Sequence, residues 1–470
     1  MLFSRKMIKK ILLLNPPIYF KNGIPYALDS SVPPLGLLYI ASYINKYSNK
    51  FRVKVIDIPV EKLTIKEIVK IVNRFKPLAI GISSMTPQLQ GTVELAAYLK
   101  KKCSVKFKIF LGGPHISADP TFINRFPVFD YAITGEVEKT FFDSINKLSQ
   151  QKKIPKIQKG KIIENLDLLP LADRKLIKRE LYNKRESMMF SRGCPYHCYY
   201  CSRPAISKVI RYRSSDNLIQ EIQKVYSSCG GKIDFQDDTF TLNKKKVVDF
   251  CKSVERKKLK LDWRCNTRID LVDEYLLKQM KQAGCSLIHF GIESGNEKLR
   301  KNVINKGNFS NKQIYRILEL CKKYKIKTGG YFMIGHPGET KKEIADTKKM
   351  IFKTNFDLLG LSIPTPFPGS KLYEIAEKKD IISKIIIDKF ARKELGVGYA
   401  GIYPVFIPEN LTKKYLYEQM QDINRKFYLN LKTFIKHLKK SFRSPSKIKK
   451  DFTDFVYLIT KGVSSRKPYR

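Results

Sequence analysis

The stretch Ser191–Pro204, SRGCPYHCYYCSRP, places three cysteines within eight residues of a 470-residue chain. Cys194, Cys198 and Cys201 have the spacing CxxxCxxC. A structural zinc site normally closes with four protein ligands, and His197 is the only obvious companion in the loop. A four-iron cluster held by three thiolates leaves one iron with an open coordination position. The spacing therefore favours a cluster that binds a further molecule over a structural zinc ion.

Short apolar runs alternate with helical patterns from this stretch onward. The runs are MMFS from Met188, then KIDFQDD, LDWRCNTRID, SLIHFGIES, TGGYFMIG and LLGLSIP. Six strand and helix units in series predict a barrel or partial barrel of parallel strands, with its chemistry at the carboxyl ends of the strands. The three cysteines follow the first predicted strand and so lie at that edge. Cys265, on the third predicted strand, is a candidate hydrogen donor if it faces the barrel interior.

The first third of the chain has a similar alternation, in KILLLN, VKVIDI, LAIGISS, KIFLGG and DYAITG. This pattern predicts a doubly wound parallel sheet with helices on both faces. Ser83, Gly112, Gly113 and Gly135 come just after predicted strands, at the edge where such sheets bind ligands. Residues 151–185 are rich in lysine with few strand signals, and predict a linker.

The cysteine stretch resembles the radical S-adenosylmethionine (radical SAM) superfamily, whose hallmark is CxxxCxxC with an aromatic residue before the last cysteine, here Tyr200. In that superfamily the open iron chelates S-adenosylmethionine, and one electron splits the sulfonium bond to free a 5′-deoxyadenosyl radical. The resemblance implies that Cys194, Cys198 and Cys201 hold a [4Fe-4S] cluster and form the catalytic centre.

Other strand ends resemble the segments of that superfamily that hold S-adenosylmethionine. FQDD resembles the segment that contacts the amino group of S-adenosylmethionine, and Arg268 in NTRID resembles a donor to its carboxylate. GIESG resembles the segment that reaches the ribose or the methionine. GYFMIGHPGET resembles the segment behind the adenine. The contacts implied are Tyr200, Gln236, Asp237, Asp238, Arg268, Glu293, Ser294 and Gly335.

The first domain resembles the cobalamin-binding domain of one branch of the superfamily, through LLNPP, PPLGLLYIA, GISSMTPQ, LGGPH and TGE. The cobalamin contacts implied are Asn15, Pro16, Gly36, Ser83, Gly112, Gly113, Pro114, His115, Gly135 and Glu136. The Asp-x-His-x-x-Gly motif, whose histidine ligates cobalt, is absent, since the equivalent IDIPVEKLT has no histidine. A domain that keeps this fold without the corrin is therefore the alternative.

These resemblances imply an α/β chain in four parts. Residues 1–150 form a doubly wound, Rossmann-like cobalamin-binding domain and 151–185 a linker. Residues 186–385 form a partial (β/α)6 TIM-type radical SAM barrel, and 386–470 a mostly helical basic region.

The implied function is that of a cobalamin-dependent radical SAM methyltransferase acting on an unactivated carbon of a small-molecule or lipid substrate. An oxidative cyclase or a rearrangement enzyme with the same cofactors is one alternative, and an RNA-modifying radical SAM enzyme another. The first domain offers only Cys103 toward a second cluster, and no RNA-binding module follows the barrel, so nucleic acid is not an expected partner. An electron donor such as ferredoxin or flavodoxin is an expected partner.

The composition is strongly basic, with a formal net charge of +47. Lysines occur in nearly every segment, so this charge alone identifies no partner. The sequence has no secretory signal and no apolar run of about 18 residues, which predicts a cytoplasmic protein. Arg425–Lys450 has ten basic and no acidic residues, with apolar residues at helical spacing. It predicts a basic amphipathic helix that either docks on the inner face of the membrane or covers the barrel.

Overall fold

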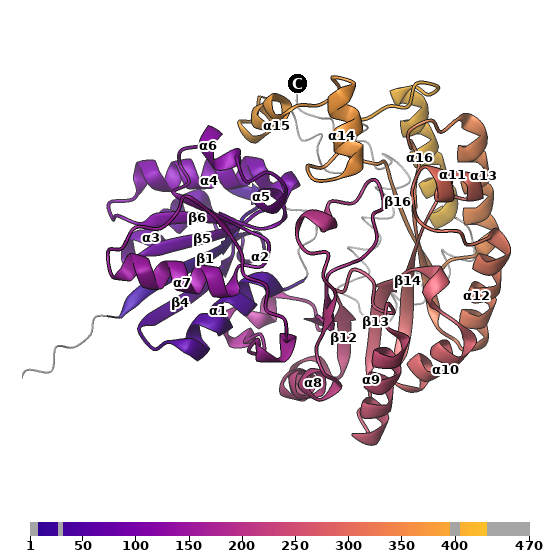
Figure 1. The fold of residues 1–470 in the computed structure, drawn as a ribbon, viewed down its shortest axis with the longest axis horizontal. Helices are drawn as coiled ribbons and strands as arrows, with labels where there is room; N and C mark the ends of the chain where they lie inside the picture. The colour runs from indigo at the N-terminus through magenta and orange to yellow at the C-terminus, as the bar shows by residue number, and fades with distance from the viewer. Residues whose placement is uncertain (1–7, 27–31, 395–404, 430–470) are drawn as a thin grey trace, which may run out of the picture.

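The computed structural model describes residues 8–26, 32–394 and 405–429 (Figure 1). Two parallel sheets of six strands each organise it, in the orders β4-β1-β5-β6-β7-β8 and β9-β12-β13-β14-β15-β16. Figure 1 shows the first sheet with its helices on one side of the molecule and the second sheet with its own helices on the other. The predicted α/β fold class, a doubly wound domain followed by a partial barrel, is confirmed.

The first sheet is built from β1 (Lys9–Asn15), β4 (Phe51–Asp57), β5 (Ala79–Ser83), β6 (Lys108–Gly112), β7 (Tyr131–Thr134) and β8 (Ile157–Lys159). Its helices are α1 (Leu35–Tyr47), α2 (Ile58–Glu61), α3 (Ile65–Phe75), α4 (Leu89–Lys102), α5 (Pro114–Ala118), α6 (Phe122–Arg125) and α7 (Glu138–Ser149), with a hairpin of β2 (Tyr19–Lys21) and β3 (Ile24–Tyr26). α1 and α7 pack on one face and α3 and α4 on the other, because the strands are apolar on both sides. The chain order reverses between β1 and β5, a point where such sheets bind ligands.

The strand β8 lies inside the segment expected to be a linker and pairs with β7. It is an edge strand whose first and last residues are exposed, so it carries no apolar run that the sequence could reveal. The rest of this segment forms three short turns, η2 (Leu166–Leu168), η3 (Arg174–Leu176) and η4 (Arg179–Leu181).

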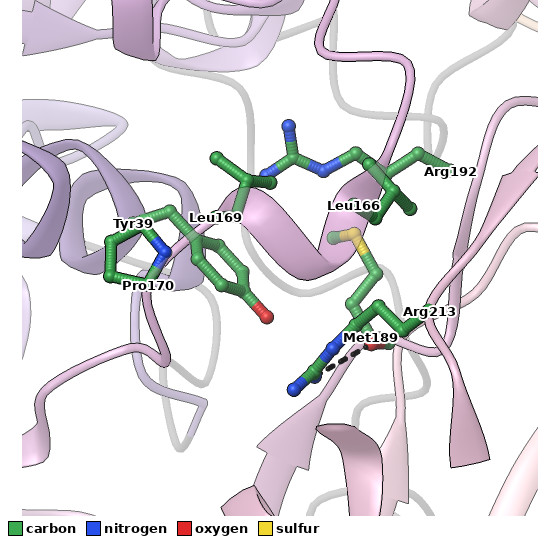
Figure 2. Close-up of a pocket in the computed structure, with 7 residues that line it drawn as sticks. All are labelled: Tyr39, Leu166, Leu169, Pro170, Met189, Arg192 and Arg213. Atoms are coloured by element: carbon green, nitrogen blue, oxygen red, sulfur yellow. Dashed lines mark hydrogen bonds between the residues drawn. The ribbon is translucent and has the colours of Figure 1, made fainter. Parts of the chain in front are cut away.

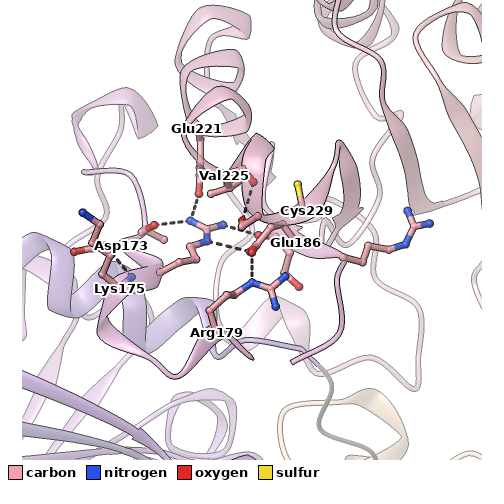
Figure 3. Close-up of polar contacts among 12 residues, drawn as sticks. Asp173, Lys175, Arg179, Glu186, Glu221, Val225 and Cys229 are labelled. Atoms are coloured by element: carbon pink, nitrogen blue, oxygen red, sulfur yellow. Dashed lines mark hydrogen bonds and ion pairs between the residues drawn. The ribbon is translucent and has the colours of Figure 1, made fainter. Parts of the chain in front are cut away.

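A buried ion network fastens this connecting segment to the second domain (Figure 3). Arg174 contacts Glu186 on the first strand of the second sheet and Glu221 on a helix behind it. Arg179 also pairs with Glu186, and Arg213 pairs with Glu221. Of these five side chains only Arg179 is partly exposed, so each of the four buried charges depends on its partners for its stabilisation.

The second sheet is built from β9 (Glu186–Met188), β12 (Lys232–Phe235), β13 (Asp262–Thr267), β14 (Cys285–Glu293), β15 (Lys327–Met333) and β16 (Leu358–Ser362). Its helices are α8 (Ser215–Cys229), α9 (Lys244–Arg256), α10 (Glu274–Gln282), α11 (Glu297–Asn302), α12 (Asn311–Lys323) and α13 (Lys341–Thr354). A short ladder of β10 (Ser191–Arg192) and β11 (Arg211–Tyr212) brackets the cysteine loop.

Aromatic side chains fill the space between this sheet and its helices, with Trp263 against Phe235, Phe240 and Phe250. Cys265 lies in the same core and is 1% exposed. Cys265 therefore does not meet the condition set for a hydrogen donor, because side chains alternate along a strand and its neighbours Arg264 and Asn266 are the less buried, inward ones.

The helices after the barrel are α14 (Lys371–Lys378), α15 (Lys384–Ala391) and α16 (Lys413–Leu429). α14 and α15 return to the first domain, where Arg125 donates to Asp388 at 2.7 Å. α16 returns to the barrel, with Phe427 buried in its core. The predicted basic helix Arg425–Lys450 lies outside the described residues, apart from residues 425–429. Within the described ranges, no helix has both the length and the apolar content needed to cross a bilayer.

Candidate functional site

The cysteine loop follows β9 and β10 at the carboxyl edge of the second sheet. Its three thiols are free, and the Cys201 N–H donates to the Cys198 carbonyl at 2.9 Å. Burial raises the pKa of the Cys201 thiol to about 11 and also raises the pKa of Cys198. Bound iron would have to displace these protons, as metal binding to thiols generally does.

Among the described residues, no three Cys, His, Asp or Glu side chains converge closely enough to hold one metal ion. In a four-iron cluster each thiolate binds a different iron, so the three sulfurs do not need to meet at one point. Three free thiols on a single loop at the strand ends therefore fit a cluster.

Tyr196 fixes the first half of this loop to the strand end of β13. The guanidinium of Arg268 lies 3.8 Å from the centre of the Tyr196 ring. Arg268 also donates two hydrogen bonds to Asp270, of 3.0 and 2.7 Å, so the Nε and Nη2 groups of this expected donor to the S-adenosylmethionine carboxylate already have a partner. Its Nη1 is buried with no partner among the described residues and remains a donor for another acceptor.

Tyr200 fixes the second half of the loop to β14. Its hydroxyl donates to Glu293 at 2.8 Å, and Lys306 donates to the same carboxylate oxygen at 2.8 Å. A Cβ on Gly291 would lie 2.7 Å from the Lys306 Nζ, so glycine makes room for this cation. Burial raises the pKa of Cys198, and the charge of Lys306 opposes that effect.

Sequence reasoning missed Lys306, which is 7% exposed. It stands in a loop outside the predicted strands and helices. In a chain with 90 lysines and arginines, no local signal separates one buried lysine from the exposed ones.

The two carboxylates of FQDD have different surroundings. Asp238 pairs with Arg203 at 2.9 Å and, like Gln236, lines a large cavity. Asp237 points away from it and accepts from the Phe190 and Ser191 N–H groups at 3.0 and 2.5 Å. Burial raises the pKa of Asp237 to about 6. Asp237 therefore anchors the chain that leads into the cysteine loop.

The last two strand ends hold Ser294 and Gly335. Ser294 is fully buried, with its Oγ 3.1 Å from the Thr347 Oγ1. Gly335 has a φ of 97°, and its N–H donates to Glu339. Burial raises the pKa of Glu339 to about 7. These contacts shape the loops behind the site rather than its open surface.

A cavity lies between the two domains and opens to solvent; counted together with the solvent at its mouth, its space is about 900 Å³. Its walls from the first domain include Gly36, Ser83, Gly113, Gly135, Glu136, Val137 and Glu138. Its walls from the second part of the chain include Met189, Ser191, Arg192, Gly193, Arg203, Ile206, Gln236 and Asp238. The cavity thus reaches from the strand ends of the first sheet to the residue directly before Cys194.

Five of the residues expected to contact cobalamin line this cavity: Gly36, Ser83, Gly113, Gly135 and Glu136. Gly112 lines an adjoining pocket of about 360 Å³, whose walls are mainly apolar. A Cβ on Gly81 would lie 2.7 Å from a Leu13 methyl group, in the floor of that pocket. A large solvent-open cavity with an apolar side pocket fits a corrin with an appended nucleotide.

The other expected cobalamin residues support the loops behind the cavity. Asn15 donates to Asp57 at 3.0 Å, and the Pro16 carbonyl accepts from Gln88 at 2.8 Å. Pro114 begins α5.

His115 is buried in the first domain, with Nδ1 3.1 Å from the Thr86 hydroxyl and its ring edge against Phe122. Burial lowers the pKa of His115 to about 4. This depressed pKa means that the stabilisation by the neutral ring is present above about pH 6.5 and is lost as pH falls toward 4.

His115→Gln stays uncharged at every pH and can still bond Thr86. We expect the stability of the wild type to fall by about 3 kcal/mol more than that of this variant between pH 7 and pH 4. Urea unfolding at both pH values measures the difference. Equal pH dependence in the two proteins would contradict this account of the ring.

Ion pairs cross the domain interface beside the cavity. Arg192 donates to Glu136 at 3.2 Å and to Glu138 at 2.7 Å, and Arg211 also donates to Glu136. Next to them, Arg192 lines a smaller pocket of about 240 Å³ together with Tyr39 of α1 (Figure 2). Burial raises the pKa of Tyr39 to about 12. The loop that carries Cys194 is thereby held against the first domain.

Known proteins resemble both halves of the chain. The family model for the B12 binding domain matches residues 27–143, and that for the radical SAM superfamily matches residues 188–351. The uncharacterized methyltransferase PH0819 of Pyrococcus horikoshii is 31% identical over 92% of this chain and 95% of its own. The anaerobic magnesium-protoporphyrin IX monomethyl ester cyclase of Rubrivivax gelatinosus is 24% identical over 91% of this chain and 79% of its own.

A solved structure shares the overall fold. The radical S-adenosylmethionine methyltransferase TsrM from Kitasatospora setae, with cobalamin and a [4Fe-4S] cluster bound, superposes with a TM-score of 0.67 at 18% identity, over 79% of this chain and 78% of that one. Two matching domains, a full-length relative and the shared fold agree. The chain belongs to the family of B12-binding radical SAM enzymes, whose cofactors are a [4Fe-4S] cluster, S-adenosylmethionine and cobalamin.

Proposed function

We propose that this enzyme is a methyltransferase that acts on an unactivated carbon of a small-molecule or lipid substrate. The observation that carries the proposal is the cavity of about 900 Å³, because loops of both domains form its walls. Cofactors bound at the carboxyl edges of the two sheets would both face this cavity. The names of two relatives, PH0819 and TsrM, describe methyltransferases and point the same way.

We assign Cys194, Cys198 and Cys201 to the cluster. When bound, the cluster and S-adenosylmethionine supply a carbon-centred radical and the corrin supplies a transferable methyl group, and this hard chemistry belongs to the cofactors. The protein orients them. Tyr196 and Tyr200 hold the cysteine loop on the strand ends of β13 and β14 through Arg268 and Glu293.

We assign S-adenosylmethionine to the strand ends next to this loop. Gln236 and Asp238 offer polar groups on the cavity wall, and the free Nη1 of Arg268 offers one donor to a carboxylate. Asp237, Ser294 and Gly335 act behind this surface, through the backbone positions they fix. We assign the corrin to the glycine-lined first-domain wall.

The test is reconstitution without oxygen in the presence of titanium citrate, cobalamin and S-adenosylmethionine carrying a ¹³C-methyl group. We expect labelled methyl on the retained corrin and formation of 5′-deoxyadenosine. Release of 5′-deoxyadenosine with corrin bound but no label on it would favour the cyclase or rearrangement alternative. Absence of corrin under these conditions would overturn the proposal.

Gly36 allows the corrin wall to be tested without damage to the fold. It lies in the first turn of α1 and lines the cavity, and a Cβ there would meet no atom of the described residues within 4 Å. A larger side chain also suits a helix better than glycine. We expect Gly36→Phe to keep the thermal stability of the wild type and to retain less than about a tenth of its corrin, because the phenyl ring would occupy the space that the corrin needs.

Asn45→Phe, on the exposed side of the same helix, is the matched control and should bind corrin as the wild type does. Absorbance of the desalted protein gives the corrin content. Normal retention by Gly36→Phe would place the corrin elsewhere.

A further inference from the structure

The inner face of the second sheet, the face opposite its helices, carries a layer of polar side chains. Its members are Asp234, Arg264, Asn266, His289 and Tyr331, none of which is fully buried. Barrel interiors are normally filled by layers of branched apolar residues. This layer is therefore unsuited to close packing and suited to contact with a polar molecule.

Two aromatic rings form the floor of this layer. His289 of β14 and Tyr331 of β15 stack with ring centres 5.3 Å apart and planes 24° apart. A Cβ on Gly329 would lie 2.1 Å from the His289 ring, and a Cβ on Gly360 would lie 2.6 Å from the Tyr331 ring. The rings can lie flat against the sheet only because both positions are glycine, which is unfavourable inside a strand and marks a close approach.

Polar groups border this pair of rings, here called the ring platform. Arg264 donates to Asp234 at 2.6 Å, and its Nε is buried with no partner in the described protein. The Tyr331 hydroxyl lies 3.5 Å from the Asn266 amide oxygen. Tyr331 is 41% exposed, so the platform is not covered by other side chains. A flat surface with a donor beside it suits a planar ring that carries an acidic group.

The platform lies one layer below the residues assigned to S-adenosylmethionine. Tyr331 is in register with Gly291, two residues before Glu293, and Asn266 lies two residues before Arg268. Two residues along a strand span about 7 Å. A molecule on the platform would thus lie about 7 Å along the strands from the groups assigned to the cosubstrate.

We propose that the ring platform binds the substrate, which is a planar conjugated ring bearing a carboxylate, with Arg264 at its acidic edge. This inference rests on the proposed function, because it names the substrate class of that site. Tetrapyrrole carboxylates and indole carboxylates both belong to the class. Saturated ring systems do not.

The test is equilibrium dialysis of the reconstituted enzyme, with S-adenosylmethionine and without reductant. The probes are protoporphyrin IX and indole-3-propionate, planar ring carboxylates of two sizes, and cyclohexanepropionate as their saturated counterpart. We expect at least one planar probe to bind at least about tenfold more tightly than the saturated one. Tyr331→Ala and Arg264→Met should each reduce that binding by about tenfold or more.

Tyr275→Ala and Arg256→Met, at exposed positions on outer helices, are the matched controls and should bind as the wild type does. Gly360→Ala provides a second route, since its Cβ would push Tyr331 off the sheet. No preference for a planar probe, or unchanged binding by the Tyr331 and Arg264 variants, would overturn the inference. Transfer of labelled methyl to the corrin in the same variants would show that the proposed function survives such a failure.

Discussion

Replacement of any one of Cys194, Cys198 and Cys201 by alanine is expected to abolish formation of 5′-deoxyadenosine. Each cysteine is the sole thiolate for one iron of a cluster held by three, so the loss of one leaves two iron sites without protein ligands. The loop has no spare thiol to take over, because the other cysteines of the barrel lie in its core. Anaerobic reconstitution followed by iron analysis, visible absorbance and 5′-deoxyadenosine measurement checks this result.

Cys103→Ala is the matched control, because this cysteine directly follows α4 in the first domain and packs, partly buried, against another core. It should keep the cluster and the wild-type yield of 5′-deoxyadenosine. The three loop variants should also keep their bound corrin, since the corrin wall belongs mainly to the first domain. Cleavage of S-adenosylmethionine by a Cys198→Ala protein at the wild-type rate would refute the assignment of the cluster to this loop.

The positions of most strands along the chain could be predicted because each buried parallel strand is a short apolar run in the sequence. β1 shows this well, with Ile11, Leu12, Leu13 and Leu14 all buried. β8 escaped prediction because an edge strand is exposed and needs no such run. The inward or outward direction of Cys265 was also out of reach, since it depends on which of two alternating sets of residues meets the helices.

Within the site, the sequence predicted which loops matter better than which side chain in each loop faces the cavity. FQDD offers two adjacent carboxylates, and only the structure shows that Asp238 lines the cavity while Asp237 holds backbone N–H groups. Asp270 lies two residues after Arg268 and accepts hydrogen bonds from its Nε and Nη2 groups, so these two donors already have a partner. Lys306 reaches the site through a tertiary contact with Glu293. Such contacts leave no periodic trace in a sequence.

Arg174→Met is expected to lower the free energy of unfolding by about 3–5 kcal/mol, the usual cost of removing one partner from a buried ion pair. Arg174 is central to the buried ion network, where it donates hydrogen bonds to Glu186, Glu221 and the carbonyls of Ala172 and Ser187. Its loss would leave two buried carboxylates with one arginine each and two carbonyls without that donor. Urea unfolding of the cofactor-free chain at pH 7 gives the value.

Arg256→Met is the matched control, because Arg256 is 68% exposed and its partner Asp216 is 3.7 Å away. An exposed pair contributes about 0–1 kcal/mol, so this variant should unfold nearly as the wild type does. Equal losses in the two variants would show that the network contributes no more than a surface contact.

The pH dependence separates lost charge pairing from lost packing. Burial acts to raise the pKa of Glu221, but Arg174 and Arg213 outweigh it and hold this pKa below its usual value. Because the pKa of Glu221 is lower in the folded than in the unfolded protein, ionised Glu221 stabilises the fold above the unfolded pKa of about 4.3. That contribution is lost as pH falls from about 4.3 through the folded pKa. Without Arg174 the depression should shrink, so the variant should lose less stability than the wild type as pH falls below about 4.3, and its defect should be largest at pH 7 and narrow toward pH 3. A defect of constant size from pH 7 to pH 3 would instead assign the loss to packing, because only the ion pair titrates.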